Sequence, residues 1–212
     1  MSDCTFCDEL STGEPPSALA GDEERLAWLS QQWAILPSLG PVSPLHLLVV
    51  PRRHCTFALA AADAVPTIDA VAQAARERFS SDVDVLVFEH ANAASGCGVV
   101  HAHAHVVTVP RNVEVRGIFG RESSHRLRSL NDIEELRQEL SWCKVAGASS
   151  AAISVRLPSQ TGRRAVAAAN GVTFDTDWKA YTHRPWFESS RRAAFELADV
   201  LRRSACLARP AA

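Results

Sequence analysis

The sequence lacks a strong charge of either sign, a long apolar run and the features of an export signal. Its formal net charge is −2 over 212 residues, which gives no support for a nucleic-acid or membrane surface as the main partner. No apolar segment approaches the length needed to span a membrane. The start, MSDCTFCDELSTGE, has neither the basic region nor the apolar stretch of a signal peptide. We therefore expect a cytoplasmic protein with no nucleic-acid or membrane partner.

Repeats and low-complexity tracts are also missing, and cysteine is present without the context of a secreted scaffold. Six cysteines are enough for three disulfides, but the chain is neither short nor apparently exported. Free thiols or metal ligands are therefore favoured over disulfides. The hydrophobic content of 47% supports one sizeable core with a small appended region.

Strand-like and helix-like segments alternate irregularly along the chain. The β-rich runs are Trp28–Ile35, His46–Val50, Asp84–Glu89 and Ala151–Val155. Helical patterns cover residues 56–79 with a break near Pro66, Ser129–Trp142, a segment that follows PSQTG and ends at Asn170-Gly171, and Ser189–Leu207. Residues 111–128 are polar and arginine-rich, as in an irregular excursion. This pattern predicts an α+β fold with a mostly antiparallel sheet and helices on one side.

Three of the eight histidines stand at alternate positions in GCGVVHAHAHVVTVP, residues 96–110. The run is rich in valine, so we expect a strand, in which alternate side chains share a face. His101, His103 and His105 would then point one way, and a small apolar face would point the other. A merely solvated edge usually carries Thr, Lys, Glu or Arg. Three imidazoles favour metal binding, proton transfer or nucleophilic chemistry.

The pair Cys4 and Cys7, in CTFC near the start, is a second candidate for chemistry. Taken alone, this spacing fits a redox pair, half of a zinc site or coincidence. A closed tetrahedral zinc needs two further ligands, for which His54 and His101 are candidates. Spacing alone does not decide between this site and two surface thiols, and the continuation of a zinc finger is absent.

Several motifs together resemble the histidine triad (HIT) superfamily. HAHAHVV is similar to its signature, LHLLVVPRRH to the preceding strand that ends in proline, basic residues and histidine, and CTFC to an N-terminal cysteine pair of many members. VFEHANAASGCGVVHAH further resembles the zinc-containing branch related to galactose-1-phosphate uridylyltransferase. LPSQTGRRAVA and Trp178 weakly resemble a C-terminal element of longer members.

The resemblance implies a HIT-like fold and an enzyme that acts on nucleotides at the α-phosphate. It gives His103 the role of the nucleophile, which forms a nucleotidyl-histidine, and places His105 near the leaving group. It also implies a structural zinc ion on Cys4, Cys7, His54 and His101. For substrate binding we single out a set around the SGCG turn and in the C-terminal element: His90, Asn92, Ser95, Gly96, Cys97, Gly98 and Gln160.

The sequence also departs from the family pattern. Leu45 stands where members often have a glycine before the histidine at position 46, and Cys97 and Gly98 replace Gln and a hydroxyl residue in the phosphate loop. The uridylyltransferases usually have glutamine at the third histidine position. His105 therefore favours hydrolysis. Arg163 or Arg164 is a further candidate for phosphate contacts, although a solvated arginine face explains both equally well.

Three functions follow as alternatives. The first is a HIT-type nucleotide hydrolase, which acts on a dinucleoside polyphosphate or a nucleoside phosphoramidate. The second is a nucleotidyltransferase or phosphorylase, and the third is an inactive zinc-stabilised nucleotide-binding protein. We expect a catalytic domain with the zinc knuckle over residues 1–128, and a C-terminal extension over residues 129–212 packed on the same domain. Because family members are commonly symmetric and a sheet edge offers a surface, a homodimer is also expected.

Overall fold

The structure is a computed structural model, and it describes residues 4–13, 24–61, 63–79, 82–90, 100–111, 125–127, 140–148, 151–155, 160–173 and 184–207. Its strands are β1 (Ala27–Trp28), β2 (Trp33–Pro37), β3 (His46–Pro51), β4 (Val83–Glu89), β5 (Ala104–Pro110), β6 (His125–Leu127), β7 (Leu140–Val145) and β8 (Ala151–Val155). Its helices are α1 (Thr5–Thr12), the 3-10 turn η1 (Ala58–Ala60), α3 (Ala64–Arg78), α5 (Thr161–Ala169) and α6 (Arg184–Leu207).

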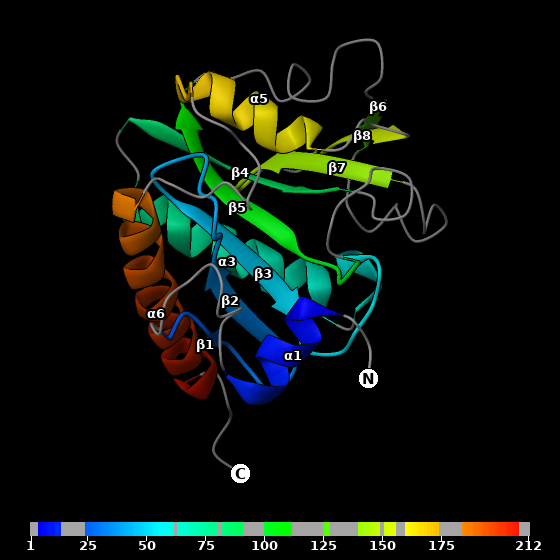
Figure 1. Cartoon of the computed structure of the whole chain (residues 1–212), viewed down its shortest axis with the longest axis vertical. Helices are drawn as coiled ribbons and strands as arrows, with labels where there is room; N and C mark the ends of the chain where they lie inside the picture. The colour runs from blue at the N-terminus through cyan, green and yellow to red at the C-terminus, as the bar shows by residue number, and fades with distance from the viewer. Residues whose placement is uncertain are drawn as a thin grey trace.

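All eight strands of the described residues form one sheet in the order β1-β2-β3-β5-β4-β7-β8-β6. Every neighbouring pair is antiparallel. The strand that carries the last histidine of the repeat, β5, lies inside the sheet, because it pairs with β3 on one side and β4 on the other. Figure 1 shows β2, β3 and β5 side by side, with α3 behind them. The predicted α+β class and antiparallel sheet are confirmed.

The two faces of the sheet carry different layers. The two long helices, α3 and α6, pack on one face through small and branched residues such as Ile68, Val71 and Ala194. On the other face α5 packs over β4 and β5, and α1 packs over β2 and β3. The prediction that the helices lie on one side of the sheet therefore holds for the two long helices, α3 and α6. The two short ones cover the opposite face, where the histidines lie.

A buried ion pair anchors α1 to the edge of the sheet. Glu9 of α1 accepts a hydrogen bond from Arg25, and each side chain is only 1% exposed. Arg25 also donates to the carbonyl of Pro37, at the end of β2, over 2.8 Å. The N-terminal helix is thereby fixed against the strands from which the site is built.

Two predictions of secondary structure need correction. Residues 28–35 form two strands joined by a turn at 29–32, because Ser30 caps the turn through the amides of Gln32 and Trp33. The helix predicted over Ser129–Trp142 is wrong at its end: residues 140–142 begin β7, where Trp142 is completely buried between β4 and β8. Residues 128–139 lie outside the described residues.

The other helices are close to their predicted places. The break in the 56–79 segment separates η1 from α3. Pro66 lies in the first turn of α3, where a missing N–H costs nothing. Helix α5 ends at Ala169 with Asn170 as its C-cap, and Gly171 follows with φ +67°. Helix α6 starts five residues before its predicted start. No described helix has the length and apolarity to cross a bilayer.

The segments after residue 128 join the same sheet and the same core. Strand β7 pairs with β4, and α6 contributes Ala193, Ala194, Leu197 and Ala198 to the cluster beneath β2 and β3. The edges of the sheet are β1, of two residues, and β6, of three. The division at residue 128 and the homodimer stay predictions.

Candidate functional site

The four predicted metal ligands come together beside the end of β3. One ligand atom from each of Cys4, Cys7, His54 and His101 lies within 4.8 Å of all the others, and we call this group the Cys2His2 cluster. The Sγ of Cys7 lies 3.2 Å from Nδ1 of His54 and 3.4 Å from Nδ1 of His101. The Sγ of Cys4 lies 3.5 Å from the same His101 nitrogen.

These separations fit a tetrahedral zinc ion. With Zn–S of about 2.3 Å and Zn–N of about 2.0–2.1 Å, ligand atoms at the corners of a tetrahedron lie roughly 3.3–3.8 Å apart. Two thiolates and two imidazoles are also a common donor set for structural zinc. His101 Nε2 donates to the carbonyl of Pro51 over 2.7 Å, so Nδ1 carries the lone pair that a metal requires.

The cluster is physically joined to the proposed nucleophile. The ring of Phe6, between the two cysteines, packs edge-on against both His101 and His103, with centroid distances of 5.8 and 5.3 Å. The amide of Ala102 donates to the carbonyl of Cys55 over 2.7 Å. The segment that precedes β5 is therefore held from both sides, and a metal at the cluster would stiffen it.

The histidine repeat is only partly a strand. Strand β5 begins at Ala104, so His101 and His103 precede it. The alternation survives nevertheless: Ala102 and Ala104 belong to the core under α3, and the three imidazoles face the α1 side. His103 Nδ1 donates to the carbonyl of His101 over 2.8 Å. In neutral His103 this leaves the lone pair on Nε2, the form in which imidazole is a nucleophile.

A fourth histidine, His46 at the start of β3, lies beside His105. It is completely buried, and its Nδ1 accepts a hydrogen bond from the amide of Val42 over 3.2 Å. Its Nε2 must then carry the proton, which it donates to Nδ1 of His105 over 2.9 Å. His105 is consequently a neutral imidazole with its proton on Nε2. The backbone thus fixes the tautomer of both rings.

His105 is also clamped by aromatic contacts. The ring of Phe88 stacks on it at 4.5 Å and 8°. The rings of His103 and His90 meet it edge-on at 4.9 and 5.6 Å. The four imidazoles of His46, His90, His103 and His105 therefore form one contiguous set, which we call the histidine group.

Burial keeps the histidine group neutral. Desolvation lowers the pKa of His90 to about 3 and that of His103 to about 4, and a smaller contribution comes from the nearby guanidinium of Arg163. Burial also lowers the pKa values of His46 and His105 well below the usual value, with neighbouring imidazoles and Arg163 adding to the effect. At pH 7 these imidazoles are therefore neutral, which is the protonation state that their hydrogen bonds require.

Helix α5 brings Arg163 to this face of the sheet. Arg163 is buried and donates to the hydroxyl of Ser38 and to the carbonyl of Gly40, in the loop that leads from β2 to β3. That loop also holds Val42, whose amide sets the tautomer of His46. Arg163 therefore supports the site through the loop, and the alternative of a solvated arginine does not hold for it; Arg164 is exposed.

The predicted substrate-binding residues divide into two groups. His90 belongs to the histidine group, where its ring meets that of His105. Gln160 is the N-cap residue of α5. Asn92, Ser95, Gly96, Cys97 and Gly98 lie outside the described residues. Sequence reasoning did not assign His46 to the site. Its position in LHLL, with alternate spacing from Leu48 in a strand that pairs with β5, is the signal that would have found it.

Glu89, next to His90, serves the opposite face of the sheet. Its two carboxylate oxygens accept from the amide of Ala58 over 2.6 Å and from Nε1 of Trp142 over 2.9 Å. Burial raises the pKa of this carboxyl group to about 8. It ties η1, which follows His54, to the centre of the sheet.

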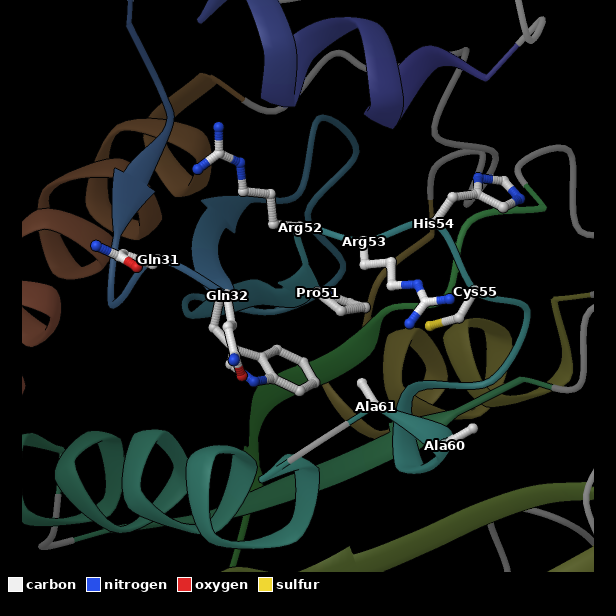
Figure 2. A pocket seen from close by; sticks show the side chains of 10 residues that line it. Gln31, Gln32, Pro51, Arg52, Arg53, His54, Cys55, Ala60 and Ala61 are labelled. Atoms are coloured by element: carbon white, nitrogen blue, oxygen red, sulfur yellow. The ribbon is translucent and has the colours of Figure 1, made fainter.

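A hollow of about 580 Å³ opens on the outer side of the Cys2His2 cluster. It is lined by the turn between β1 and β2, the end of β3 and η1 (Figure 2). Arg53 and Cys55 point towards one another there, and His54 turns away from them. Arg52 lies over the ring of Trp28 at 5.4 Å.

Comparisons with known proteins give structural likeness only. No family model matches the chain, and no curated protein matches it. A hypothetical histidine triad nucleotide-binding protein from Sulfolobus tokodaii is 14% identical, with 98% of this chain and 100% of that one covered at a TM-score of 0.49. A HIT family hydrolase from Clostridium thermocellum is 16% identical (54% and 96% covered, TM-score 0.42).

A zinc-bound histidine triad family protein from Mycobacterium smegmatis is 23% identical, with 53% of this chain and 78% of that one covered at a TM-score of 0.36. The solved structures found to be similar thus include histidine triad proteins, one of them with zinc. The assignment to the branch related to galactose-1-phosphate uridylyltransferase stays a prediction.

Proposed function

We propose that this protein cleaves a nucleotide conjugate at its α-phosphate through a covalent nucleotidyl intermediate on His103. The observation that carries the proposal is the hydrogen bond from His103 Nδ1 to the carbonyl of its own segment, which leaves the Nε2 lone pair for attack. The neighbouring His105 has its proton on Nε2 and is placed to donate to an oxygen of the phosphate or leaving group.

The reaction has two steps. The Nε2 lone pair of His103 forms a bond to the α-phosphorus while the bond to the leaving group breaks, and the leaving group departs with that electron pair. Water then attacks the same phosphorus, the P–N bond breaks and the electron pair returns to His103. The products are a nucleoside monophosphate and the released group. With an acceptor other than water, the same intermediate would give nucleotidyl transfer.

We also propose one zinc ion per chain on the Cys2His2 cluster. When bound, zinc would cross-link α1, the end of β3 and the segment before β5. The role of the zinc ion would be structural. It would fix His101, whose backbone carbonyl accepts the hydrogen bond that orients His103.

The deciding experiment is rapid quench with a substrate labelled at the α-phosphate. Labelled protein should appear in the wild type and be absent from His103→Ala, which should lose nearly all turnover but retain its fold and zinc. His105→Ala should keep some activity. Product analysis with and without phosphate or a sugar phosphate as acceptor separates hydrolysis from transfer. A fully active His103→Ala protein would refute the covalent mechanism, and light scattering tests the predicted homodimer.

A further inference from the structure

Glu89 is a buried carboxyl group on the face of the sheet opposite the histidine group. It is 1% exposed and reaches Ala58 and Trp142 in the core beneath α3, whereas its neighbour Phe88 stacks on His105 on the other face. Its two oxygens accept from the amide of Ala58 over 2.6 Å and from Nε1 of Trp142 over 2.9 Å. Burying such a group costs free energy, which these two hydrogen bonds offset.

The bond to Ala58 fixes one end of a short segment. Ala58 is the first residue of η1, and the segment leads there from the end of β3. Near the other end lies His54, a member of the Cys2His2 cluster. Cys55 turns back on the segment, since its thiol donates to the carbonyl of Phe57 over 3.5 Å. The backbone of Cys55 is therefore held between the cluster on one side and Glu89 on the other.

The carbonyl of Cys55 connects this segment to the proposed nucleophile. It accepts from the amide of Ala102 over 2.7 Å. That N–H and the carbonyl of His101 belong to the same planar peptide group, so neither can rotate without the other. The His101 carbonyl is the atom that accepts from Nδ1 of His103 over 2.8 Å. Glu89 is thus connected to the ring of the nucleophile through three hydrogen bonds.

The second bond of Glu89 leads away from the nucleophile. Trp142 lies in β7, which pairs with β4 and β8, and its indole belongs to the core beneath the sheet. The two bonds of one carboxyl group therefore have different consequences. One fixes the segment beside the nucleophile, and the other fixes a strand of the sheet.

We propose that Glu89 is a positioning residue for the proposed reaction, and that it sets the orientation of His103 through the amide of Ala58 and the carbonyl of Cys55. This inference rests on the proposed function and adds a residue to it. The contribution of Glu89 is to keep the imidazole in one orientation before the attack, which raises kcat without a contact to the substrate.

The bond to Ala58 needs only a carbonyl oxygen. Burial raises the pKa of Glu89 to about 8, so the group is largely neutral at pH 7, and a neutral carboxyl group keeps its carbonyl oxygen as an acceptor. A glutamine amide has the same carbonyl oxygen, but its NH2 group would meet the indole N–H of Trp142. Replacing Trp142 by phenylalanine removes that conflict.

The test therefore compares three proteins: Trp142→Phe alone, and Trp142→Phe combined with Glu89→Met or with Glu89→Gln. The substrate is a dinucleoside polyphosphate or a nucleoside phosphoramidate labelled at the α-phosphate. Trp142→Phe should lower the melting temperature and leave kcat close to that of the wild type. Adding Glu89→Met should lower kcat and the rate of protein labelling roughly tenfold to a hundredfold with little change in KM, because the nucleophile loses its fixed orientation. Adding Glu89→Gln should instead preserve most of both rates.

Two further measurements do not need turnover. The amide of Ala102 should exchange its hydrogen faster in the Glu89→Met protein than in the Glu89→Gln protein, while the amides of β2 keep their protection. Nitrogen NMR should find the proton of His103 on Nδ1 in the Glu89→Gln protein and distributed over both ring nitrogens in the Glu89→Met protein. If Trp142→Phe does not fold, the wild type and Glu89→Met in the otherwise unchanged chain are compared by the same measurements.

Three results would overturn the positioning role. They are a Glu89→Met protein as active as its Glu89→Gln counterpart, a kcat that follows the melting temperature across the set, and a loss of bound zinc that accompanies the loss of kcat. The expected changes at Ala102 and His103, without any labelling of the wild type, would support the positioning of His103 by Glu89 and refute the reaction instead.

Discussion

Removing Arg25 should destabilise the protein far more than removing an ordinary arginine. Arg25 and Glu9 are each 1% exposed, and Arg25 has a second bond to the carbonyl of Pro37. The substitution Arg25→Met keeps most of the aliphatic volume but leaves the Glu9 carboxyl group buried without its partner. Breaking a buried pair from one side costs about 3–5 kcal/mol. For a chain of this size that corresponds to a fall in melting temperature of roughly 6–20 °C.

The loss should depend on pH in a defined direction. Burial raises the pKa of Glu9 above its usual value, and Arg25 opposes that rise. Without Arg25 the pKa of the folded state rises further. A group whose pKa is raised on folding stabilises the fold fully below its unfolded value near 4.5, and this contribution is lost as the pH rises. The deficit of Arg25→Met should therefore grow from pH 5 to pH 7, by at most about 1.4 kcal/mol per pH unit.

The assay is urea unfolding at pH 5, 6 and 7 on the wild type, Arg25→Met, Glu9→Leu and the double variant. The double variant should be more stable than either single variant, because no charge is left buried. Asp199→Asn is the control: it breaks the ion pair with Arg202, in which both side chains are about half exposed, and should cost no more than about 1 kcal/mol. A cost for Arg25→Met as small as for the control, or one that shrinks as the pH rises, would refute this reasoning.

Three further predictions concern the metal, a carboxyl group and the histidine group. Zinc-replete protein should contain one zinc per chain by elemental analysis, and Cys7→Ser should lose the metal and melt at a lower temperature. Because burial raises the pKa of Glu89 to about 8, its contribution to stability should decline by about 1.4 kcal/mol per pH unit from about pH 4.5 to 8. The free energy of unfolding of the wild type minus that of Glu89→Gln should fall with pH at this slope. Parallel curves of unfolding free energy against pH would contradict the prediction. His46→Phe should lower kcat roughly tenfold to a hundredfold with little change in KM, because it removes the hydrogen bond that keeps the proton of His105 on Nε2. An unchanged kcat would show that this hydrogen bond is not needed.

Much of the sheet was predictable because its strands are short apolar runs bounded by turn residues. HLLVVP and DVLVFE lie in the sheet interior as their composition indicates. The helix predicted over Ser129–Trp142 was wrong at its end, where residues 140–142 belong to β7. The prediction followed from the helical spacing and the good N-cap of SLNDIEELRQELSW. Packing overrides that local preference: Trp142 and Cys143 are completely buried, and β7 pairs on both sides.

The candidate site was predictable where ligand chemistry restricts the choice of residue. The cysteine pair and the alternate histidines made Cys4, Cys7, His54 and His101 candidates, but spacing alone did not decide between a metal site and surface thiols. The resemblance to histidine triad proteins supplied the complete ligand set, and the structure brings these four residues together. The supporting residues carry no such signature. Arg163 lies 125 positions from Ser38, and only the folded sheet shows that α5 reaches the β2–β3 loop. In the sequence His46 is one residue of an apolar strand, and only the structure shows that both of its ring nitrogens form hydrogen bonds.

The wide separation of these partners along the chain has a kinetic consequence. The Cys2His2 cluster joins positions 97 residues apart, Arg163 joins the β2–β3 loop across 125, and the amide of His46 donates to the hydroxyl of Ser190 across 144. Such long loops must close before their contacts return any stability, which slows folding. The histidine group can therefore reach its final arrangement only late in refolding, after α5 and α6 have docked. Recovery of activity should lag behind the return of secondary structure.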